Sequence, residues 1–516
     1  MSRLRSVVLG ACLWAGCSSP EDEGWAPAEA PPGEAQTPSS EGPTHEPAPG
    51  PTPDTQAPPP TAATACSGPE GTARLAWSHD AAWNHTVDFR GTMDADGNTY
   101  WTECESSYWV DKDPSQLACQ LVSVTRDGAV RYQRALPPPG AWAVHTVDGG
   151  QLFVTGRLAL LTAMDSATGQ ARWSVSLGAV KDPNPEAHHA LRVESLVRSP
   201  PYLVAVVHDT FGDVGAEDLL VAVHADTGAV AWQVRMPPVY APLVVDTDGN
   251  IYAGASNVLE QTTELFSFSA DGQLRWRTHR EGVLDPTAVD DGTLLLGRSE
   301  LVDAATGAPR ATLATASSES FDYSLGRSSS PFGRAAMQAG RMLVLPDLQC
   351  TTEGCPTTTH PGDTFLYGLD IESGAVKWHR AVGAWPMSPL LTQRDSLLLV
   401  DRPVEAQCGE NLCTGEDAGI GTFLRELDLD GQELSACALP GKAPYITPPA
   451  LHQGRVVLGA WTNWNAENDW TLRMSIRAFD LAAPTEPATG GWVSAGGGNT
   501  RSGQAKPEAA PAQAVR

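Results

Sequence analysis

Basic residues are scarce in this chain of 516 residues, where 34 Lys and Arg stand against 61 Asp and Glu and the formal net charge is −27. A protein that binds phosphate backbones needs a basic patch, and no such patch stands out in the sequence. We therefore expect no nucleic-acid partner. The acidic balance keeps the protein soluble and poorly attracted to anionic surfaces, but it carries no information about the fold.

Long hydrophobic runs are also missing. The apolar run SVVLGACLWAG (6–16) follows the basic stretch MSRLR and is too short to span a bilayer. WAGC, ending at Cys17, resembles a bacterial lipobox, although leucine is usual where Trp14 stands. LGAC, ending at Cys12, fits the consensus better but leaves too short an apolar stretch before it. A plain secretory signal is the alternative.

We predict a lipoprotein signal peptide over 1–17 and lipidation of Cys17. Two or more acyl chains on one cysteine anchor a protein stably. The protein would then contact the membrane through its lipid anchor only. The predicted location is the bacterial cell envelope, anchored to the outer membrane and facing the periplasm or the exterior.

Residues 18–65 contain no Lys or Arg and are rich in Pro, Ala, Glu, Ser and Thr. Such a segment cannot bury enough apolar area to offset the entropy lost on ordering, so we predict a disordered tether. At about 3.1 Å per residue it would hold a domain ~100 Å or more from a membrane. Residues 506–516 are predicted to be a disordered tail, which leaves 66–505 as the folded domain.

Catalytic and metal-binding motifs are lacking too. The serines have no nucleophile-elbow sequence around them, and no Gly-rich phosphate loop is present. DADGN (94–98) and DTDGN (246–250) superficially resemble calcium loops, but the EF-hand spacing and its terminal Glu are missing, so both are predicted to be hairpin turns. His188 and His189 have no evident third ligand. We predict no catalytic residue and no metal ligand.

A repeat of about eleven residues is what the sequence does contain. It combines an acidic position, Thr-Gly or a related pair, and a tryptophan four residues after the glycine. The copies that match best are AMDSATGQARW (163–173), AVHADTGAVAW (222–232), SFSADGQLRW (267–276) and GLDIESGAVKW (368–378). Degenerate copies are SVTRDGAVRY (123–132), LVDAATGAPRA (301–311) and ELDLDGQELS (426–435), and IRAFDLAAP (476–484) is a partial unit without its tryptophan strand.

The copies are about 35 to 67 residues apart, which is centred on the period of a four-stranded propeller blade. Upstream of each copy, two apolar strands are joined by a tight turn with Asp-Gly-like residues, which supply the positive φ that a hairpin needs. In the repeat the Asp accepts backbone N–H bonds across the turn and the Gly takes the left-handed conformation. Strand alternation directs the tryptophan into the seam between blades. The docking residues are predicted to be Tyr132, Gly169, Trp173, Gly228, Trp232, Trp276 and Trp378.

These residues resemble the pyrroloquinoline-quinone-like (PQQ-like) repeat of β-propellers over roughly residues 70–505. GGWVSAGGGNTRSGQ (490–504) is similar to an element commonly found at one end of such proteins. The resemblance implies an all-β fold, an eight-bladed propeller of four-stranded antiparallel blades. A count of seven follows if one degenerate unit is misread. ARLAW (73–77) would close the ring beside RMSIRAFD (473–480), because an open ring leaves unpaired sheet edges.

In such a ring, four loops between second and third strands are long, in blades 1, 6, 7 and 8: 104–119, 347–363, 402–421 and 462–470. These blades are contiguous, so one arc of one face is elaborated, and loops on a rigid scaffold are where binding usually occurs. Three cysteine pairs each lie within one loop: Cys104 and Cys119, Cys350 and Cys355, Cys408 and Cys413. Three local disulfides are expected in an oxidising compartment. Cys66 and Cys437 remain and would join the N-terminal strand to the outer strand of the neighbouring blade. Metal binding by the Cys-x4-Cys pairs is the alternative.

The loop of blade 8 offers Trp461, Trp464 and Trp470 among amides and carboxylates, which suits sugar stacking or a protein hot spot. Packing of the loop on the blade is the structural alternative. We predict a non-catalytic, monomeric envelope propeller without a cofactor that binds protein or glycan. Its architecture and anchor are similar to those of the propeller lipoprotein of the outer-membrane barrel-assembly machinery.

The resemblance also implies an alternative, a periplasmic quinoprotein oxidoreductase that holds PQQ with calcium in the central funnel. Its relatives carry an adjacent cysteine pair and a Glu/Asn/Asp calcium set. This sequence has no Cys-Cys dipeptide, and the acidic set cannot be placed in it.

Overall fold

The computed structural model describes most of residues 66–488 and none of residues 1–65 or 489–516. Longer gaps within the described part are 106–115, 183–190, 210–216, 313–335, 349–363, 402–421 and 463–472. By its contacts the chain divides into two units, Met1–Pro59 and Pro60–Arg516, and the fold below is that of the second. The predicted signal peptide, lipidation at Cys17, the tether and the tail all fall outside the described residues.

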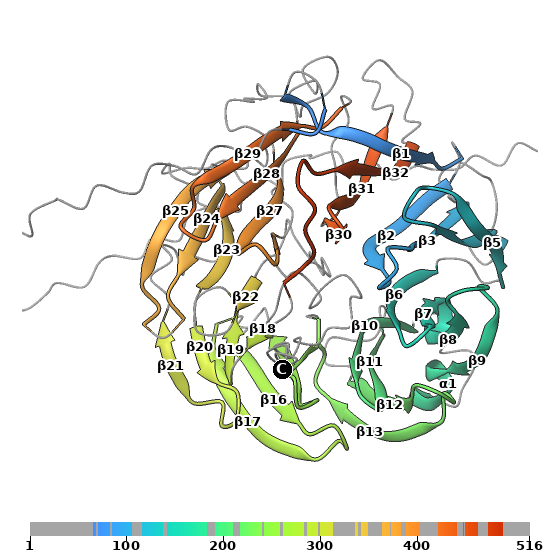
Figure 1. The fold of residues 1–516 in the computed structure, drawn as a ribbon. Helices are drawn as coiled ribbons and strands as arrows, with labels where there is room; N and C mark the ends of the chain where they lie inside the picture. The colour runs from blue at the N-terminus through green and yellow to red at the C-terminus, as the bar shows by residue number, and fades with distance from the viewer. Residues whose placement is uncertain are drawn as a thin grey trace, which may run out of the picture. The chain divides into compact units, whose positions relative to one another are not determined.

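The second unit contains eight four-stranded antiparallel sheets, numbered here as blades 1 to 8 (Figure 1). Blade 1 consists of β2 (His85–Met93), β3 (Thr99–Glu105), β4 (Cys119–Val124) and β5 (Val130–Leu136). Blade 2 consists of β6 (Ala143–Asp148), β7 (Gln151–Gly156), β8 (Leu160–Asp165) and β9 (Ala171–Ser176). Blade 3 consists of β10 (Leu191–Ser199), β11 (Tyr202–Asp209), β12 (Asp218–His224) and β13 (Val230–Met236). Blade 4 consists of β14 (Val244–Val245), β15 (Ile251–Asn257), β16 (Thr262–Phe268) and β17 (Leu274–Glu281).

The second half of the ring continues in the same order. Blade 5 consists of β18 (Pro286–Asp290), β19 (Thr293–Leu296), β20 (Glu300–Asp303) and β21 (Pro309–Thr312). Blade 6 consists of β22 (Ala336–Gln338), β23 (Met342–Leu348), β24 (Thr364–Leu369) and β25 (Val376–Val382). Blade 7 consists of β26 (Leu390–Leu391), β27 (Ser396–Asp401), β28 (Phe423–Asp428) and β29 (Glu433–Ala438). Blade 8 consists of β30 (Ala450–His452), β31 (Arg455–Thr462), β32 (Arg473–Asp480) and β1 (Arg74–Asp80).

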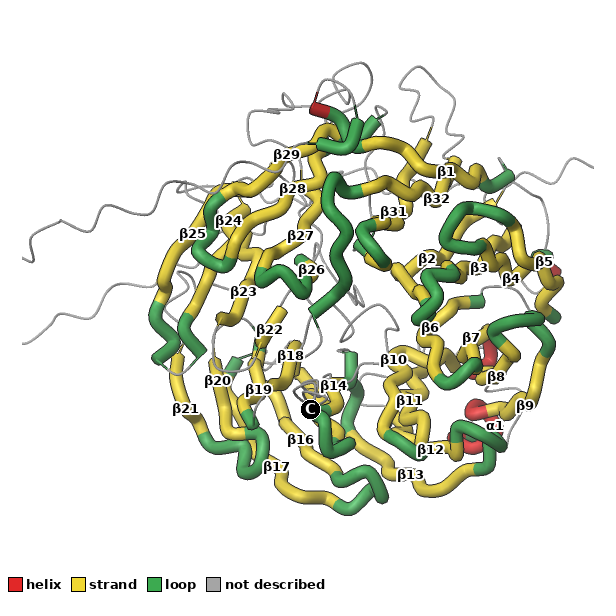
Figure 2. The backbone as a smooth tube through the Cα atoms, viewed as in Figure 1, coloured by secondary structure: helices red, strands yellow, loops and turns green. Residues whose placement is uncertain are grey.

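The helical elements named among the described residues are short and belong to blade 2: η3 (Arg157–Ala159) between β7 and β8, and α1 (Leu177–Lys181) after β9 (Figure 2). The first strands of blades 1 to 6 pack on one another in chain order, and blade 8 packs on β2. Buried apolar clusters join blade 6 to blade 7, blade 7 to blade 8 and blade 8 to blade 1. The sheets therefore form a closed ring of eight blades, and the predicted all-β propeller is confirmed with eight blades rather than seven.

Burial explains why these sequences form strands in this order. The second strands are rich in apolar residues and largely buried, as in β7, in which all six residues are buried. The outer strands alternate, as in β9 and β17, where partly buried and exposed residues succeed each other. A strand covered on both faces needs apolar side chains throughout, whereas an outer strand buries only one row. The core of the unit therefore lies between the blades.

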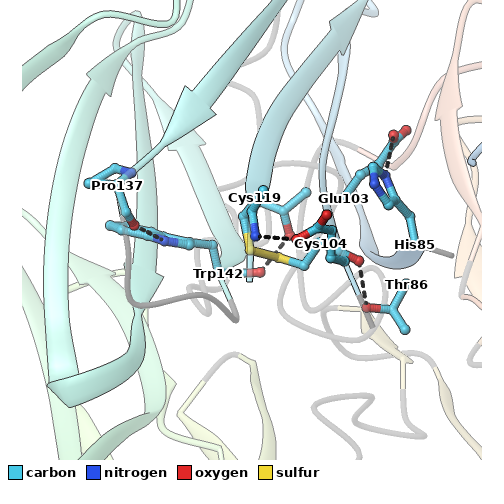
Figure 3. The surroundings of a disulfide bond; sticks show 10 residues. His85, Thr86, Glu103, Cys104, Cys119, Pro137 and Trp142 are labelled. Carbon is cyan, nitrogen blue, oxygen red and sulfur yellow. Dashed lines mark hydrogen bonds and ion pairs between the residues drawn. A yellow bond between two sulfur atoms is a disulfide. The ribbon is translucent and has the colours of Figure 1, made fainter. Parts of the chain in front are cut away.

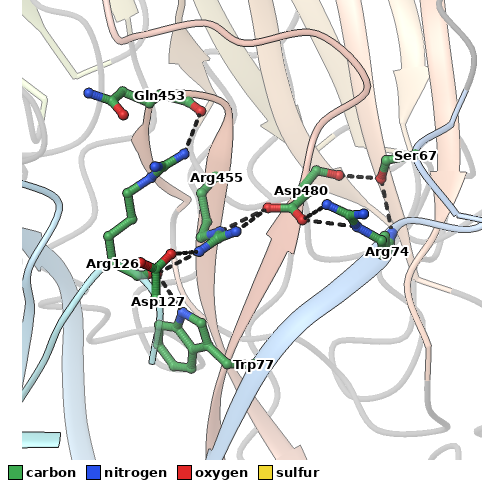
Figure 4. Close-up of polar contacts among 8 residues, drawn as sticks. All are labelled: Ser67, Arg74, Trp77, Arg126, Asp127, Gln453, Arg455 and Asp480. Carbon is green, nitrogen blue, oxygen red and sulfur yellow. Dashed lines mark hydrogen bonds and ion pairs between the residues drawn. The ribbon is translucent and has the colours of Figure 1, made fainter. Parts of the chain in front are cut away.

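The ring is closed by the N-terminal strand, as the sequence predicts. β1 pairs with β32 in antiparallel register from Arg74 opposite Asp480 to Asp80 opposite Ser475. Arg455 of β31 donates from Nε to Asp480 at 2.8 Å and from Nη1 to Asp127 of blade 1 at 2.8 Å (Figure 4). β1 and β32, which lie far apart in the sequence, are thus paired with each other. Arg455 links β32 to blade 1.

The aromatic residues of the repeat lie flat on the turn glycines of the next blade. A Cβ atom built on Gly228 would lie 2.5 Å from Cε3 of Trp173, so only glycine leaves room for the ring. Gly228 also has a φ of +71°, which a residue with a Cβ rarely adopts. The indole Nε1 of Trp173 donates to the carbonyl of Ala225 at 2.9 Å. Each docked ring therefore fills the seam and satisfies a polar group in the same place.

The same arrangement recurs in six seams of the ring. The ring and glycine pairs are Trp77 on Gly128, Tyr132 on Gly169, Trp173 on Gly228, Trp232 on Gly272, Trp276 on Gly307 and Trp378 on Gly431. Trp77 was not among the predicted docking residues, because it lies on the closing strand β1, far in sequence from the partial unit that it completes. It donates from Nε1 to the carbonyl of Arg126 at 2.8 Å. The missing tryptophan strand of blade 8 is therefore supplied by the N-terminus.

Among the described residues, two seams have no docked aromatic ring. Between blades 5 and 6, Ala311 and the larger Ile371 pack against one apolar cluster. Between blades 7 and 8, Ser435 occupies the aromatic position, and blade 8 has no turn between β32 and β1, since these strands come from opposite chain ends. A small pocket lies at this seam, lined among others by Ser67, Leu398, Ser435, Cys437 and Asp480.

Both chain ends converge on the seam between blades 7 and 8. At the outer edge, the disulfide Cys66–Cys437 and a parallel bridge between Thr72 and Ala438 attach the N-terminal segment to β29. The segment after β32 crosses from blade 8 to blade 7, where Ala488 donates its N–H to the carbonyl of Leu391 at 2.9 Å. The seam between blades 7 and 8 is therefore held by the two ends of the described part of the chain.

The DADGN and DTDGN segments form hairpin turns, as predicted. Asp94 accepts the N–H groups of Asp96 at 3.0 Å and Asn98 at 2.9 Å, and its other oxygen accepts the hydroxyl of Tyr100 at 2.6 Å. Gly97 has a φ of +79°. The Asp oxygens are thus used within the turn. Among the described residues, no helix is long and apolar enough to cross a membrane.

Candidate functional site

The loop-bearing face of four consecutive blades is the candidate functional site. The connection from second to third strand spans at least ten residues in blades 1, 6, 7 and 8, and at most eight in blades 2 to 5. The closed ring makes these four blades neighbours, so the long connections share one arc. We call this arc, made of the connections 106–118, 349–363, 402–422 and 463–472, the loop face.

The connection of blade 1 has a rigid base, which the structure describes. Cys104 of β3 and Cys119 of β4 are opposite each other in register and form a disulfide with Cα atoms 4.0 Å apart (Figure 3). Glu105 donates its N–H to the carbonyl of Ala118 at 2.8 Å, and its carboxylate accepts the N–H of Ala118 at 2.9 Å. The two ends of this loop are therefore fixed to each other by a covalent bond and two hydrogen bonds.

A buried carboxylate supports this base from below. Glu103 is 3% exposed, and its Oε1 accepts the indole N–H of Trp101 at 2.9 Å and lies 2.7 Å from Nε2 of His79. Its Oε2 accepts the amide of Gln120 at 2.9 Å, and Nδ1 of His85 lies 3.9 Å away. The network joins the closing strand β1 to three strands of blade 1, at the seam where two of the long connections begin.

The charge state of Glu103 follows from these contacts. Burial by itself would raise the pKa of the Glu103 carboxyl, but hydrogen bonds from His79, Trp101 and Gln120 outweigh that cost and lower the pKa. The group is therefore a carboxylate at neutral pH. Because a buried charge is costly without such partners, the network fixes the relative position of the strands that carry it.

Sequence reasoning missed Glu103 and the two histidines. The local signal is that Glu103 follows the strand-forming run Thr99 to Thr102, all of which the structure buries. An acidic residue in such a run demands polar partners. The identity of those partners could not be read from the sequence, since His79 precedes Glu103 by 24 residues and lies in another sheet.

The predicted binding tryptophans are only partly within the described residues. Trp461 lies on β31, where its backbone is opposite Met474 of β32, and β31 packs against β2 of blade 1. Its strand therefore borders the blade that carries the Glu103 network. The residues that lie outside the described part of the chain are Trp464, Trp470, Cys350, Cys355, Cys408, Cys413, His188 and His189.

Among the described residues, no group of three or more His, Cys, Asp or Glu side chains is arranged to hold a metal ion. The two described disulfides, Cys66–Cys437 and Cys104–Cys119, pair the cysteines that the sequence pairs.

Comparison with known proteins gives one family match. A family model described as outer membrane protein assembly factor BamB matches residues 93–279 and 215–384, overlapping stretches that together cover more than half of the chain. No curated protein matches the sequence.

Several solved structures are similar to this chain. BamB from Moraxella catarrhalis is 14% identical with a TM-score of 0.43, and the match covers 79% of this chain and 100% of that one. The quinohemoprotein alcohol dehydrogenase ADHIIG from Pseudomonas putida HK5 is 12% identical with a TM-score of 0.48, covering 80% and 77%. The quinohemoprotein alcohol dehydrogenase from Comamonas testosteroni is 12% identical with a TM-score of 0.47, covering 79% and 76%. At such identities nothing about activity follows from these three likenesses.

Proposed function

The chain belongs to the family of the outer membrane protein assembly factor BamB, and from this membership we propose that it is a non-catalytic propeller of the cell envelope that docks a partner protein through its loop face. The single observation that carries the proposal is the position of the long connections. They occupy four consecutive blades and no others. Loops presented side by side by a rigid ring offer a continuous surface for a macromolecule.

The base of the loop face supports docking. The Cys104–Cys119 disulfide and the Glu103 network hold the start and end of one loop before any partner binds. Ordering a loop in advance lowers the entropy lost on association. Trp461 at the end of β31 and Trp464 and Trp470 in the blade 8 connection would serve as anchors, since such residues dominate interface energetics. A glycan is the other partner that the sequence suggests, and it is an outcome of the test below.

We propose that Cys17 carries the lipid anchor and that residues 18–65 connect the anchor to the ring. The first described residue, Cys66, forms a disulfide with Cys437 of β29 in blade 7, and β1, which follows it, pairs with β32 in blade 8. A force along the tether would therefore be transmitted to both blades. Mass spectrometry of the mature N-terminus tests this. A diacylated peptide beginning at Cys17 is expected, and a free N-terminus at another residue would contradict the anchor.

The quinoprotein alternative has no specific observation in its favour. The sequence has no adjacent cysteine pair, and the inner-strand carboxylates Asp88 and Glu194 are engaged by Arg90 and Arg192. These two observations support the proposal that the protein holds no quinone and no calcium ion. Dye-linked oxidation of alcohols or sugars after addition of the quinone and calcium would overturn the proposal.

The docking experiment compares two connections of the same ring. A photo-crosslinking residue replaces Trp109 on the loop face, and a matched control replaces Val214 in the blade 3 connection. The protein is expressed in its own envelope. We expect position 109, but not 214, to crosslink a component of the outer-membrane assembly apparatus, identified by mass spectrometry.

The variant with Trp461, Trp464 and Trp470 all replaced by Ala should lose this crosslink while keeping its thermal stability. Equal crosslinking from positions 109 and 214, or crosslinking to glycan alone, would contradict docking of a protein on the loop face.

A further inference from the structure

The pocket at the seam between blades 7 and 8 lies where Ser435 stands in the place of an aromatic ring. Its walls are mostly apolar, with Leu398 and Leu424 from blade 7 and Leu481 from the end of blade 8. It has room for about one water-sized group. Because Ala482 on its edge is exposed, the pocket can be reached from the solvent.

The residue paired with the aromatic position differs at this seam. In each of the six seams with a docked ring, the partner of the ring on the third strand of its own blade is alanine, serine or glycine, which leaves space for the ring. The pairs are Trp77 with Ala478, Tyr132 with Ser123, Trp173 with Ala163, Trp232 with Ala222, Trp276 with Ser267 and Trp378 with Gly368. In blade 7 the sizes are reversed, because Glu426 is paired with Ser435. A carboxylate therefore stands beside the position that a ring occupies elsewhere.

Glu426 is a buried carboxylate with one oxygen in use. It is 3% exposed, and its Oε1 accepts the hydroxyl of Ser396 at 2.6 Å and lies 2.6 Å from Nη2 of Arg394. No described residue is a hydrogen-bond partner for Oε2 of Glu426 or for the hydroxyl of Ser435, and both residues line the pocket. A buried carboxylate oxygen without a donor is costly, so a donor placed in the pocket is stabilising.

The second carboxylate of the pocket is already engaged. Asp480 has Nε of Arg74 at 3.0 Å from Oδ2 and Nε of Arg455 at 2.8 Å from Oδ1 (Figure 4). Its backbone carbonyl accepts the hydroxyl of Ser67, which also lines the pocket. Of the two carboxylates in the lining, Glu426 is therefore the one with an oxygen left for a ligand.

Packing alone does not require a charge at this position. The seam between blades 5 and 6 also has no docked ring among the described residues, and there a fully buried Leu301 is paired with Ala311. A leucine fills the space without loss of hydration, whereas a buried carboxylate is costly unless it is fully paired. Since Arg394 and Ser396 contact only one oxygen of Glu426, we interpret this residue as a binding group.

We propose that the pocket binds a primary alkylammonium group, which comes from a free amine or from a lysine side chain of a partner. The ammonium donates to Oε2 of Glu426 and to the hydroxyl of Ser435, and its alkyl chain lies along the leucines of the wall. An ammonium is about as small as a water molecule, carries donors only, and has the charge opposite to that of Glu426. An anion is repelled by the same carboxylate. This site does not depend on docking at the loop face.

The test is calorimetric titration of the whole chain with n-butylamine and with Nα-acetyllysine amide, the two sources of the ammonium group. The comparison compounds are butyltrimethylammonium, which has the charge without an N–H donor, butyrate and butanol. We expect saturable binding of at least one amine, and roughly tenfold or weaker binding of each comparison compound, because charge-assisted hydrogen bonds are the strong kind. Tighter binding of the lysine derivative would identify a partner's side chain as the source, and tighter binding of butylamine would identify a free amine.

Two outcomes of the titration would overturn the proposal. One is that neither amine binds saturably, which would mean that the pocket holds water only. The other is that butanol or butyltrimethylammonium binds as tightly as the amines, which would mean that the carboxylate and the N–H donors do not select the ligand.

Variants of two carboxylates locate the site. Glu426→Gln removes the charge and should weaken binding of the better amine about tenfold or more. Glu433→Gln is the matched control, because Glu433 belongs to the same blade and is also held by arginines, Arg380 and Arg425, but does not line the pocket. It should bind normally. Equal weakening by the two substitutions would contradict the assignment of Glu426.

A further variant fills the pocket and leaves its charge unchanged. Ser435→Trp places an indole at the position that rings occupy in six other seams, and Ser435→Val replaces it if that variant does not fold. Either should abolish binding of both amines, whereas Ser435→Ala keeps the space and should weaken binding less. Thermal unfolding checks that each variant is folded. Undiminished binding by a folded Ser435→Trp protein would place the amine elsewhere and overturn the proposal.

Discussion

The seam between blades 2 and 3 and the seam between blades 7 and 8 are closed by different means. In the first, the indole of Trp173 rests on Gly228 and donates to the carbonyl of Ala225. In the second, Ser435 stands at the aromatic position, and the strands that would flank a docking turn come from the two ends of the chain. A disulfide, a strand bridge and the segment after β32 close that seam instead.

The difference shows what the indole requires. A ring can dock only on a turn whose glycine lacks a Cβ and keeps a positive φ, and that turn exists only where the third and fourth strands are continuous. Blade 8 is assembled from both termini, so it has no such turn. Closing the propeller with strands from both termini therefore removes the docking turn at the seam between blades 7 and 8. The disulfide and the backbone hydrogen bonds at that seam compensate for the missing indole contact.

Removing the indole is the strongest way to test this comparison. Trp173→Ala should lower the free energy of unfolding by about 3–5 kcal/mol, because it removes a large ring and leaves a cavity. Ser435→Ala should change it by less than about 0.5 kcal/mol. Urea unfolding followed by intrinsic fluorescence and circular dichroism measures both. Similar losses for the two variants would mean that the seams are not closed differently.

The disulfide at the other seam should have the next largest effect. Replacing Cys66 and Cys437 by Ser should destabilise the protein by about 2–4 kcal/mol, since the bond closes a very long loop and constrains the unfolded chain. Replacing Cys104 and Cys119 should cost less, because that bond closes a much shorter loop. The midpoints of urea unfolding measure the difference. A larger loss for the second pair would contradict the assignment of Cys66–Cys437 as the closing link.

The turn on which Trp173 docks can be tested without changing the indole itself. Gly228→Ala places a methyl group against Trp173 in addition to straining a residue with φ +71°. Gly149→Ala is the matched control, because Gly149 has a φ of +53° but nothing within 4 Å of its Cβ direction. We expect Gly228→Ala to lose about 1–3 kcal/mol more than Gly149→Ala. Equal midpoints of urea unfolding for the two variants would show that contact between residue 228 and the indole of Trp173 does not affect stability.

The smallest effect concerns the carboxylate that shapes such a turn. The hydrogen bond from Arg172, with others from Thr168, lowers the pKa of Asp165 to about 2. Its folded pKa is below its unfolded value, so its contribution is present above about pH 4 and is lost as the pH falls toward 2. Because the group is at the surface, solvent screening keeps the effect modest.

The measurement for Asp165 is the urea midpoint at about pH 5 and about pH 2.5. Asp165→Asn should reduce the drop between the two pH values, since the amide does not titrate. An equal drop in the variant and the natural protein would exclude Asp165 as a contributor.

Much of the fold could be predicted because its signals are local. The Asp-Gly turns, the alternating outer strands and the spacing from Gly228 to Trp232 all lie within a few residues of one another, and they predict hairpins and their order. Closure by residues 73–77 followed from the incomplete last unit. The role of Trp77 did not, because its glycine, Gly128, belongs to a different sheet and is 51 positions away in the chain.

The candidate site also has a part that the sequence predicts and a part that it does not. The loop face could be predicted, since the length of a connection is a property of the sequence. The Glu103 network could not, because it depends on neighbours from two sheets that the closed ring brings together. A β-bulge changes the direction in which a side chain points. No single residue in β2, β6 or β10 predicts the bulge in that strand.

The amino-acid sequence by itself determined the repeating unit, the order of its strands, the closing strand and the arc that carries the long connections, since turns and alternation act over a few residues. Only the tertiary structure decided that the blades number eight rather than seven, which seams hold a docked aromatic ring, and which partners surround Glu103. Those outcomes require the ring to be complete, because the contacts join residues that are adjacent only once every blade has packed on the next.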